Sequence, residues 1–286
     1  MLFAVLLLAS LSAFPSLAAP IPGHLRARAA DSGWPNIIGG NAKSSFGISG
    51  GFKQSYIGKD PQNEVVLIGH YPKGSYAGSK SPGPGISGFI FEASGGPGVD
   101  ITSAKEARLT YKVKFEDGFD FQLAGKMPGL YGGSNPGVAK TCAGGHHDDN
   151  CWSARLMWRE HGDGELYAYL PTSNQHLAVC KGKCDVKYGA SIGTGKYKFM
   201  PGKWTELSER VKLNDVGKMN GEIEIFQDGQ SKISVTGLEL RGSKEGRIAG
   251  AMVHTFFGGS SKTAYASPKD QKAYFKDFII EVTEKL

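Results

Sequence analysis

Apolar and polar side chains alternate with a period of two in several short segments of this 286-residue chain. The run at 221–235, GEIEIFQDGQSKISV, holds two such stretches around Asp228–Gly229, and RLTYKVKF at 108–115 is a third. Alternation of this kind predicts half-buried strands, and Asp-Gly between two of them predicts a hairpin. Further strands are expected at residues 165–170, 196–200, 203–213 and 273–282.

No segment carries the sustained 3.6-residue pattern of an amphipathic helix, and the 41 glycines suit a chain with many turns. Many short strands joined by glycine-rich turns are typical of sandwiches and jelly rolls. We therefore predict an all-β fold, a β-jelly roll made of two antiparallel sheets, with a concave binding cleft.

The N-terminus, MLFAVLLLASLSAFPSLAAP, is an apolar run followed by small residues. It predicts a secretory signal peptide over residues 1–19. The run is shorter than the ~20 apolar residues that cross a bilayer, so we expect no membrane anchor. Residues 20–45 lack a pattern and are expected to form a flexible lead, which leaves residues 46–286 as one domain of a secreted, extracellular protein.

Four cysteines are present, and an even number in an exported chain predicts two disulfides. Three pairings are possible. The local one, Cys142–Cys151 with Cys180–Cys184, is favoured because each bridge would enclose a glycine-containing loop. The spacing in CKGKC does not fit a zinc site, and export favours oxidation.

The formal net charge is +6, and the lysines and arginines are scattered along the chain. No nucleic-acid-binding motif is present, so the expected partner is an acidic extracellular polymer, with no nucleic acid and no membrane. The chain is expected to be a monomer without a cofactor. The group His146–Asp149 contains residue types that bind metals, but adjacent side chains on a loop diverge, so a solvated loop is favoured over a metal site.

Two pairs of polar side chains stand two residues apart in the segment 151–170. Ser153 and Arg155 form one pair, and Tyr167 and Tyr169 form the other. If the two segments are neighbouring strands, all four side chains share one face of the sheet. The ordinary alternative is that such tyrosines pack with a wetted hydroxyl. The opposite, core-facing set would include Leu156, Trp158, Leu166, Ala168 and Leu170.

A second unusual segment, FDFQLAGKMPGLYGG, lies at residues 119–133. Asp120 and Gln122 would share a face if the segment begins as a strand. Lys126 precedes Met127–Pro128–Gly129, where we expect the strand to end. The hypothesis places Lys126 at the rim of the cleft, and the alternative is an ordinary surface lysine.

Three motifs, GKMPGLYGG, SARLMWR with GELYAYLP, and HTFFGGS with YASPKDQKAYFKDF, resemble polysaccharide lyase family 14 in the family's order. The likeness covers roughly residues 50–286 and is greatest to secreted fungal members. It implies a jelly-roll enzyme that cleaves polyuronates, such as alginate or glucuronan, by β-elimination, which leaves a 4,5-unsaturated uronate end. The family's functional positions correspond to Lys126, Ser153, Arg155, Tyr167 and Tyr169.

These residue types suit the chemistry. The C5 proton of a uronate is barely acidic beside a carboxylate anion, so Arg155 is expected to neutralise that carboxylate with a bidentate contact. Gln122 and Lys126 are expected to assist as donors to the developing charge. One of Tyr167 and Tyr169 is the expected acid and base, and the other binds substrate.

In this hypothesis, Arg155 and Lys126 favour the tyrosine phenolate. Lys126 is the second candidate for the base, and Ser153 positions groups by hydrogen bonding. Asp120, Arg159 and His254 are further candidates for substrate contact, although His254 suits a core position equally well.

Other classes stay open. A non-catalytic carbohydrate-binding jelly roll is the alternative to the lyase, because fold alone does not decide function. A glycoside hydrolase would need two placed carboxylates. Asp163 and Glu165 lie in HGDGE and are interpreted as turn residues instead. Among substrates, glucuronan is favoured over alginate because the resemblance is to terrestrial fungal members.

Overall fold

The computed structural model describes residues 46–49, 51–76, 87–96, 98–172, 175, 178–182, 187–258 and 263–286. The expected signal peptide (1–19), the expected flexible lead (20–45) and Cys184 lie outside the described residues. Among the described residues, no helix is long and apolar enough to cross a membrane.

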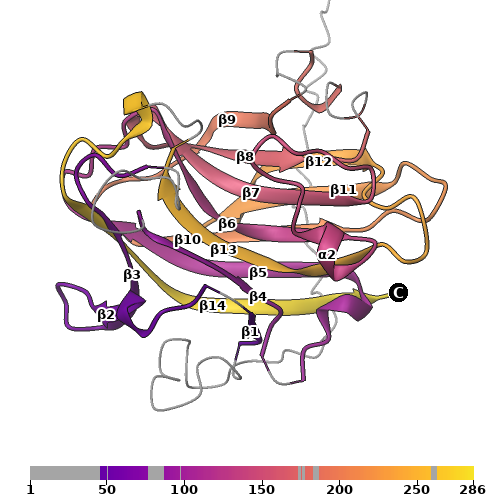
Figure 1. Cartoon of the computed structure of the whole chain (residues 1–286), viewed down its shortest axis with the longest axis horizontal. Coiled ribbons are helices and arrows are strands. Elements are labelled where there is room, and N and C mark those ends of the chain that lie inside the picture. The colour runs from indigo at the N-terminus through magenta and orange to yellow at the C-terminus, as the bar shows by residue number, and fades with distance from the viewer. Residues whose placement is uncertain are drawn as a thin grey trace, which may run out of the picture.

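Two seven-stranded sheets pack face to face (Figure 1). Every strand pair is antiparallel. Sheet A runs in the order β1 (Ile48–Ser49), β4 (Phe89–Ala93), β13 (Arg247–Phe257), β6 (Ala124–Gly133), β7 (Cys151–Arg159), β8 (Asp163–Tyr169) and β9 (Ala190–Lys198). Sheet B runs in the order β12 (Gln230–Leu238), β11 (Gly221–Gln227), β10 (Thr205–Lys212), β5 (Ala104–Phe115), β14 (Gln271–Lys285), β3 (Val65–Tyr71) and β2 (Ile57–Lys59).

Helices in the described part are short: α2 (Pro136–Ala139), η1 (Gln54–Tyr56), η3 (Ile101–Ser103), η4 (Glu160–Gly162) and η5 (Thr263–Tyr265). The predicted all-β jelly roll is therefore confirmed. The predicted hairpin is also present, with Asp228 and Gly229 at φ 50° and 78° between β11 and β12. Positive φ at both positions is what a two-residue hairpin turn requires. Strand β9 begins at Ala190, earlier than the expected segment 196–200.

Aromatic side chains fill the space between the two sheets. Trp158 is fully buried, with ring centroids of four neighbouring aromatic residues 5.2–6.0 Å away. Its indole N–H donates to the Phe121 carbonyl at 3.0 Å, so the polar atom is satisfied. The predicted core-facing side of β7 and β8 is confirmed, since its members all lie in this core: Leu156, Trp158, Leu166, Ala168 and Leu170.

Strand β6 differs from the prediction, because it continues through Pro128 instead of ending there. Between Lys126 and Gly129 it advances three residues while β7 advances two, from Met157 to Arg155, which is a β-bulge. A bulge tolerates the missing N–H of proline even between two partner strands. Lys126 consequently lies inside sheet A and is buried, not at a strand end on the rim.

Side chains of sheet B satisfy the backbone of this bulge. The Tyr111 hydroxyl donates to the Pro128 carbonyl at 3.2 Å, and the Leu130 N–H donates to Glu209 Oε2 at 2.7 Å. Burial raises the pKa of Glu209 well above its ordinary value, so the carboxyl is held in its neutral form. The irregular strand is therefore supported from across the core.

The segment 119–122 is a loop, so the expected strand there is wrong. Phe119 and Phe121 both point into the core. Gln122 takes a left-handed φ of 49°, and its N–H donates to Asp120 Oδ1 at 2.9 Å. Asp120 thus caps a local turn, which is a common alternative to strand pairing for this residue type.

Candidate active site

The two polar pairs predicted on one face do meet there. Antiparallel pairing of β7 with β8 sets Ser153 opposite Tyr169 and Arg155 opposite Tyr167. The two tyrosines pack in a small cluster with Met157 and the Cys142–Cys151 bridge, separate from the main core. The period-two interpretation of both segments is therefore confirmed.

Lys126 reaches this face from the bulge of β6. Its Nζ lies 3.3 Å from the centroid of the Tyr167 ring and 2.9 Å from Met157 Sδ. Within the described part of the chain, no carboxylate lies at ion-pair distance from it. Burial, together with the charges of Arg155 and Arg159, lowers the pKa of Lys126 well below its ordinary value. The lowered pKa favours the neutral amine over the ammonium form.

Arg155 is a buried cation without a counterion. It is 3% exposed, and among the described residues its Nε has no hydrogen-bond partner and its guanidinium no acid. Burial lowers its pKa, although the group stays charged at any ordinary pH. A buried charge is costly unless it is paired. The geometry therefore suits a ligand carboxylate that accepts hydrogen bonds from the planar Arg155 guanidinium.

Each tyrosine hydroxyl accepts from a loop amide. The Gly189 N–H donates to Tyr167 Oη at 3.1 Å, and the Gly145 N–H donates to Tyr169 Oη at 3.0 Å. The two rings meet edge to face with centroids 5.9 Å apart. Burial raises the pKa of Tyr167, and this effect is larger than the opposing effect of the Arg159 charge. The expectation that nearby cations hold Tyr167 as a phenolate is therefore wrong for the free protein.

Ser153 fixes the loop that carries Gly145. Its hydroxyl is fully buried and donates to the Cys142 carbonyl at 2.6 Å. The predicted Cys142–Cys151 disulfide is confirmed and closes the same loop. Cys180 is also disulfide-bonded, but the predicted partner Cys184 lies outside the described residues. The hydrogen bond agrees with a positioning role for Ser153.

A family model for polysaccharide lyase 14 matches residues 59–278, three quarters of the chain. The chain belongs to polysaccharide lyase family 14. It is an enzyme, a polysaccharide lyase with the jelly-roll fold. No curated protein matches it.

Solved structures give the same fold. An alginate lyase from Aplysia kurodai is 36% identical, with a TM-score of 0.70 over 82% of this chain and 90% of that one. The alginate lyase vAL-1 from Chlorella virus is 25% identical, with a TM-score of 0.69 over 85% of this chain and 93% of that one. The alginate lyase Aly36B, at 22% identity and a TM-score of 0.66 over 86% and 91%, supports the fold alone.

Glu165 of the lyase is not a turn residue, and that interpretation is wrong. It lies in β8 on the same face as Tyr167 and Tyr169, is fully unexposed, and binds Arg159 Nη2 at 2.6 Å. It also accepts from Ser191 Oγ at 3.0 Å. Its two-residue spacing from Tyr167 is the sequence signal that would have found it. Because Arg159 is engaged by Glu165, substrate binding by Arg159 stays a prediction.

His254 lies beside the cluster on β13. Its Nε2 is 3.6 Å from Glu92 Oε1, which is beyond hydrogen-bond distance. Glu92 is not among the site residues predicted from the sequence. Burial is the main cause that lowers the pKa of His254, and the charge of Arg155 adds to it. Burial therefore favours the neutral imidazole at this edge of the site, although the Glu92 carboxylate acts in the opposite direction. Its contact with substrate stays a prediction.

The remaining candidates have no contact with this cluster in the described structure. Asp120 is exposed and Gln122 half-buried in their loop, so their binding roles stay predictions. Among the described residues, no group of three or more His, Cys, Asp or Glu side chains is arranged so that it could hold a metal ion, and this includes His146–Asp149.

Proposed function

We propose that this chain is a secreted lyase that cleaves an anionic polyuronate by β-elimination. The observation that carries the proposal is a buried, unpaired Arg155 beside a lysine and a tyrosine whose pKa values are displaced in opposite directions. Such a pair of displaced groups is the usual mark of an acid and base assignment. Secretion is proposed from the apolar N-terminus and the disulfide-closed loop.

In the proposed reaction, Arg155 binds the carboxylate of the uronate and stabilises the charge that develops on it. The neutral amine of Lys126 removes the C5 proton. The C5–H electron pair forms the C4–C5 double bond as the C4–O bond breaks. The leaving oxygen takes a proton from Tyr167, which gives one new hydroxyl end and one 4,5-unsaturated uronate end without consuming water.

The roles of the two titrating groups follow from their surroundings. A lysine with a lowered pKa is available as a base, and a tyrosine with a raised pKa keeps the proton that an acid must give. This assignment makes Lys126 the base and Tyr167 the acid, and leaves Tyr169, held by Gly145, to bind substrate. It reorders the candidates proposed from the sequence, where a tyrosine stood first as base.

The same arrangement supports a stereochemical class of substrate. Because Lys126 Nζ sits over the Tyr167 ring, base and acid would approach the sugar from one side. A base and an acid on the same side of the sugar suit syn elimination, in which the C5 hydrogen and the C4 oxygen leave from the same face of the ring. They share a face in mannuronate and glucuronate but lie on opposite faces in guluronate and galacturonate.

We therefore propose polymannuronate, as in alginate, or glucuronan as the substrate. The 36% identical protein from Aplysia kurodai is an alginate lyase, which supports the first. The resemblance of the sequence motifs to fungal family members supports the second.

The test is ultraviolet absorbance during incubation with polymannuronate, glucuronan, polyguluronate and polygalacturonate. We expect the unsaturated product from the first two, lost in Lys126→Ala and Tyr167→Phe and kept in the control Tyr274→Phe, which alters a tyrosine of sheet B. Binding to the polymers without any rise in absorbance would favour the non-catalytic carbohydrate-binding protein. New reducing ends without absorbance would indicate a hydrolase.

A further inference from the structure

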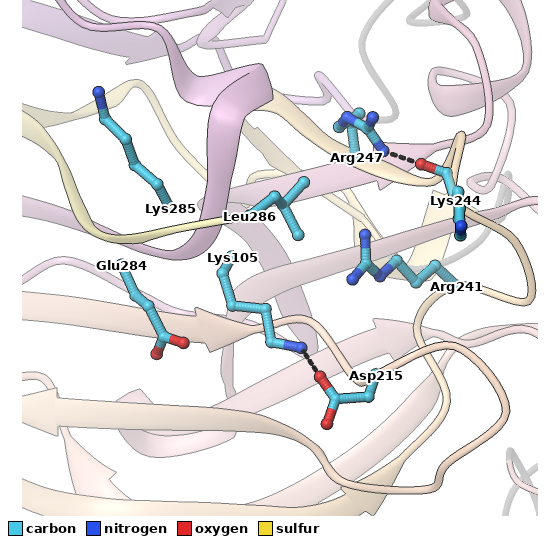
Figure 2. Close-up of a pocket in the computed structure, with 8 residues that line it drawn as sticks. All are labelled: Lys105, Asp215, Arg241, Lys244, Arg247, Glu284, Lys285 and Leu286. Atoms are coloured by element: carbon cyan, nitrogen blue, oxygen red, sulfur yellow. Dashed lines mark hydrogen bonds and ion pairs between the residues drawn. The ribbon is translucent and has the colours of Figure 1, made fainter.

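A basic pocket of about 400 Å³ lies at one end of the sandwich, apart from the catalytic cluster. Its wall combines the beginnings of β5 and β13, the end of β14, and the segments that join β10 to β11 and β12 to β13 (Figure 2). Five cationic side chains line it: Lys105, Arg241, Lys244, Arg247 and Lys285. A volume of this size is in the range of ligand sites.

The two acids in the wall are already neutralised. Asp215 accepts from Lys105 Nζ at 2.5 Å, and Glu284 accepts from Lys212 Nζ at 2.6 Å. Within the described part of the chain, Lys244, Lys285 and the two arginines have no ion pair. The excess charge of the pocket is therefore positive and available to a ligand.

The arginines are held in place by backbone contacts. Asn214 is fully buried, and its Oδ1 accepts from the Arg241 N–H at 2.9 Å, while Arg241 Nε donates to the Asn214 carbonyl at 2.9 Å. Arg247 Nη1 donates to the Gly246 carbonyl at 3.0 Å and to that of Lys244. In Figure 2 the Arg241 guanidinium points toward the middle of the pocket. Preorganised guanidiniums without an acid suit carboxylate recognition.

The distance to the catalytic cluster follows from the strand register. Arg247 pairs with Gly133 at one end of β6, and Lys126 lies seven residues along that strand. At ~3.3 Å per residue the separation is about 23 Å. No single sugar reaches from one site to the other, but one polysaccharide chain does.

We propose that this pocket is a second binding site for uronate carboxylates, which holds one part of a long acidic polysaccharide while another part is cleaved. The inference rests on the proposed function and adds a site to it. Two sites on one polymer bind with an effective concentration that raises the overall affinity without a new contact in the catalytic cluster. The contribution is therefore expected for long chains and not for short ones.

The test compares Lys244→Glu/Lys285→Glu with the control Lys53→Glu/Lys203→Glu. All four lysines are exposed, and both variants change the net charge equally. We expect the pocket variant to raise KM for the long polymer about fivefold or more above the control. Its kcat, and its KM for a tetrasaccharide of the same uronate, are expected to match those of the control. Equal KM values for the polymer in both variants would overturn the proposal.

A second measurement separates this inference from the proposed function. Electrophoretic retardation in gels that contain each polyuronate reports binding without turnover. Retardation that is weaker in Lys244→Glu/Lys285→Glu than in the control supports the pocket even if the wild type cleaves none of the polymers. If the wild type cleaves a polymer and both variants are retarded equally, the second binding site is refuted and the proposed lyase function stands.

Discussion

Replacement of Arg155 by methionine is expected to lower activity and raise stability together. The guanidinium is 3% exposed and has neither an acid nor a partner for its Nε among the described residues. Methionine fills a similar length without a charge. Loss of the two charge-assisted hydrogen bonds proposed between Arg155 and the substrate carboxylate, each worth about 1.5–3 kcal/mol, is expected to lower kcat/KM by roughly 10²–10⁴-fold.

The gain in stability has the same origin. Replacing buried ionic groups by apolar ones of similar volume stabilises proteins by about 1–4 kcal/mol in favourable cases. At about 2–4 °C per kcal/mol for a chain of this size, Arg155→Met raises Tm by about 2–16 °C. Residues of a preorganised functional site often lower the stability of the fold, so their replacement commonly raises stability and lowers activity together.

The assay is a pair of measurements on the same preparation, a thermal melt and initial rates on the cleaved polymer. Arg108→Met is the matched control, because Arg108 lies on sheet B over the Phe226 ring. This substitution is expected to change activity and Tm little. A lower Tm in Arg155→Met would refute the reasoning, since it would mean that the guanidinium is compensated in the folded protein. Unchanged activity would refute its role toward substrate.

Further predictions concern the titrating groups, the disulfide and the buried carboxyl. The pKa of Lys126 is lower in the folded protein than in the unfolded chain, where it is ~10.4. Below pH ~10.4 the unfolded chain therefore binds the Lys126 proton more tightly than the folded protein does, which destabilises the fold. Lys126→Met removes this cost and is expected to raise Tm more at pH 6 than at pH 10. For the wild type, kcat/KM is expected to rise with pH as Lys126 loses its proton and to stay high past pH ~10, because the pKa of Tyr167 is raised; a fall below pH ~9 would contradict this. Removing the Cys142–Cys151 bridge, nine residues apart, is expected to lower the free energy of unfolding in denaturant melts by about 2–3 kcal/mol and to lower kcat. Glu209→Gln is expected to keep Tm, since the carboxyl is neutral, whereas Glu209→Ala lowers it measurably; equal losses would show that the charge matters.

The face of the site could be predicted because it depends on alternation within two strands. Ser153 and Arg155 are fixed by the period of β7, and Tyr167 and Tyr169 by that of β8. Only the pairing of the two strands had to be assumed, and strands that follow one another in sequence usually pair. The core-facing set followed from the same argument.

The bulge of β6 could not be predicted, because its support is remote in sequence. Pro128 reads locally as a strand end, yet Tyr111 and Glu209 from sheet B satisfy the backbone around it. Glu165 shows the opposite case, because the sequence HGDGE is locally typical of a turn, whereas its two-residue spacing from Tyr167 is the pattern that the strand follows. The pKa shift of Lys126 arises from burial in the folded sheet, which no local pattern shows.

In the proposed mechanism, the charges of the cluster imply that the substrate changes the pKa of Lys126, its proposed base. Lys126 and Arg155 are both buried, and the nearby carboxylate of Glu165 is engaged by Arg159. A uronate carboxylate bound at Arg155 brings negative charge toward Lys126 and removes part of the repulsion that lowers its pKa. The lowered pKa favours the neutral amine in the free enzyme, and a bound carboxylate would raise that pKa and make the amine a stronger base. A neutral sugar at the same position would leave the pKa of the amine low, so in this proposal the anionic group of the substrate serves both binding and proton removal.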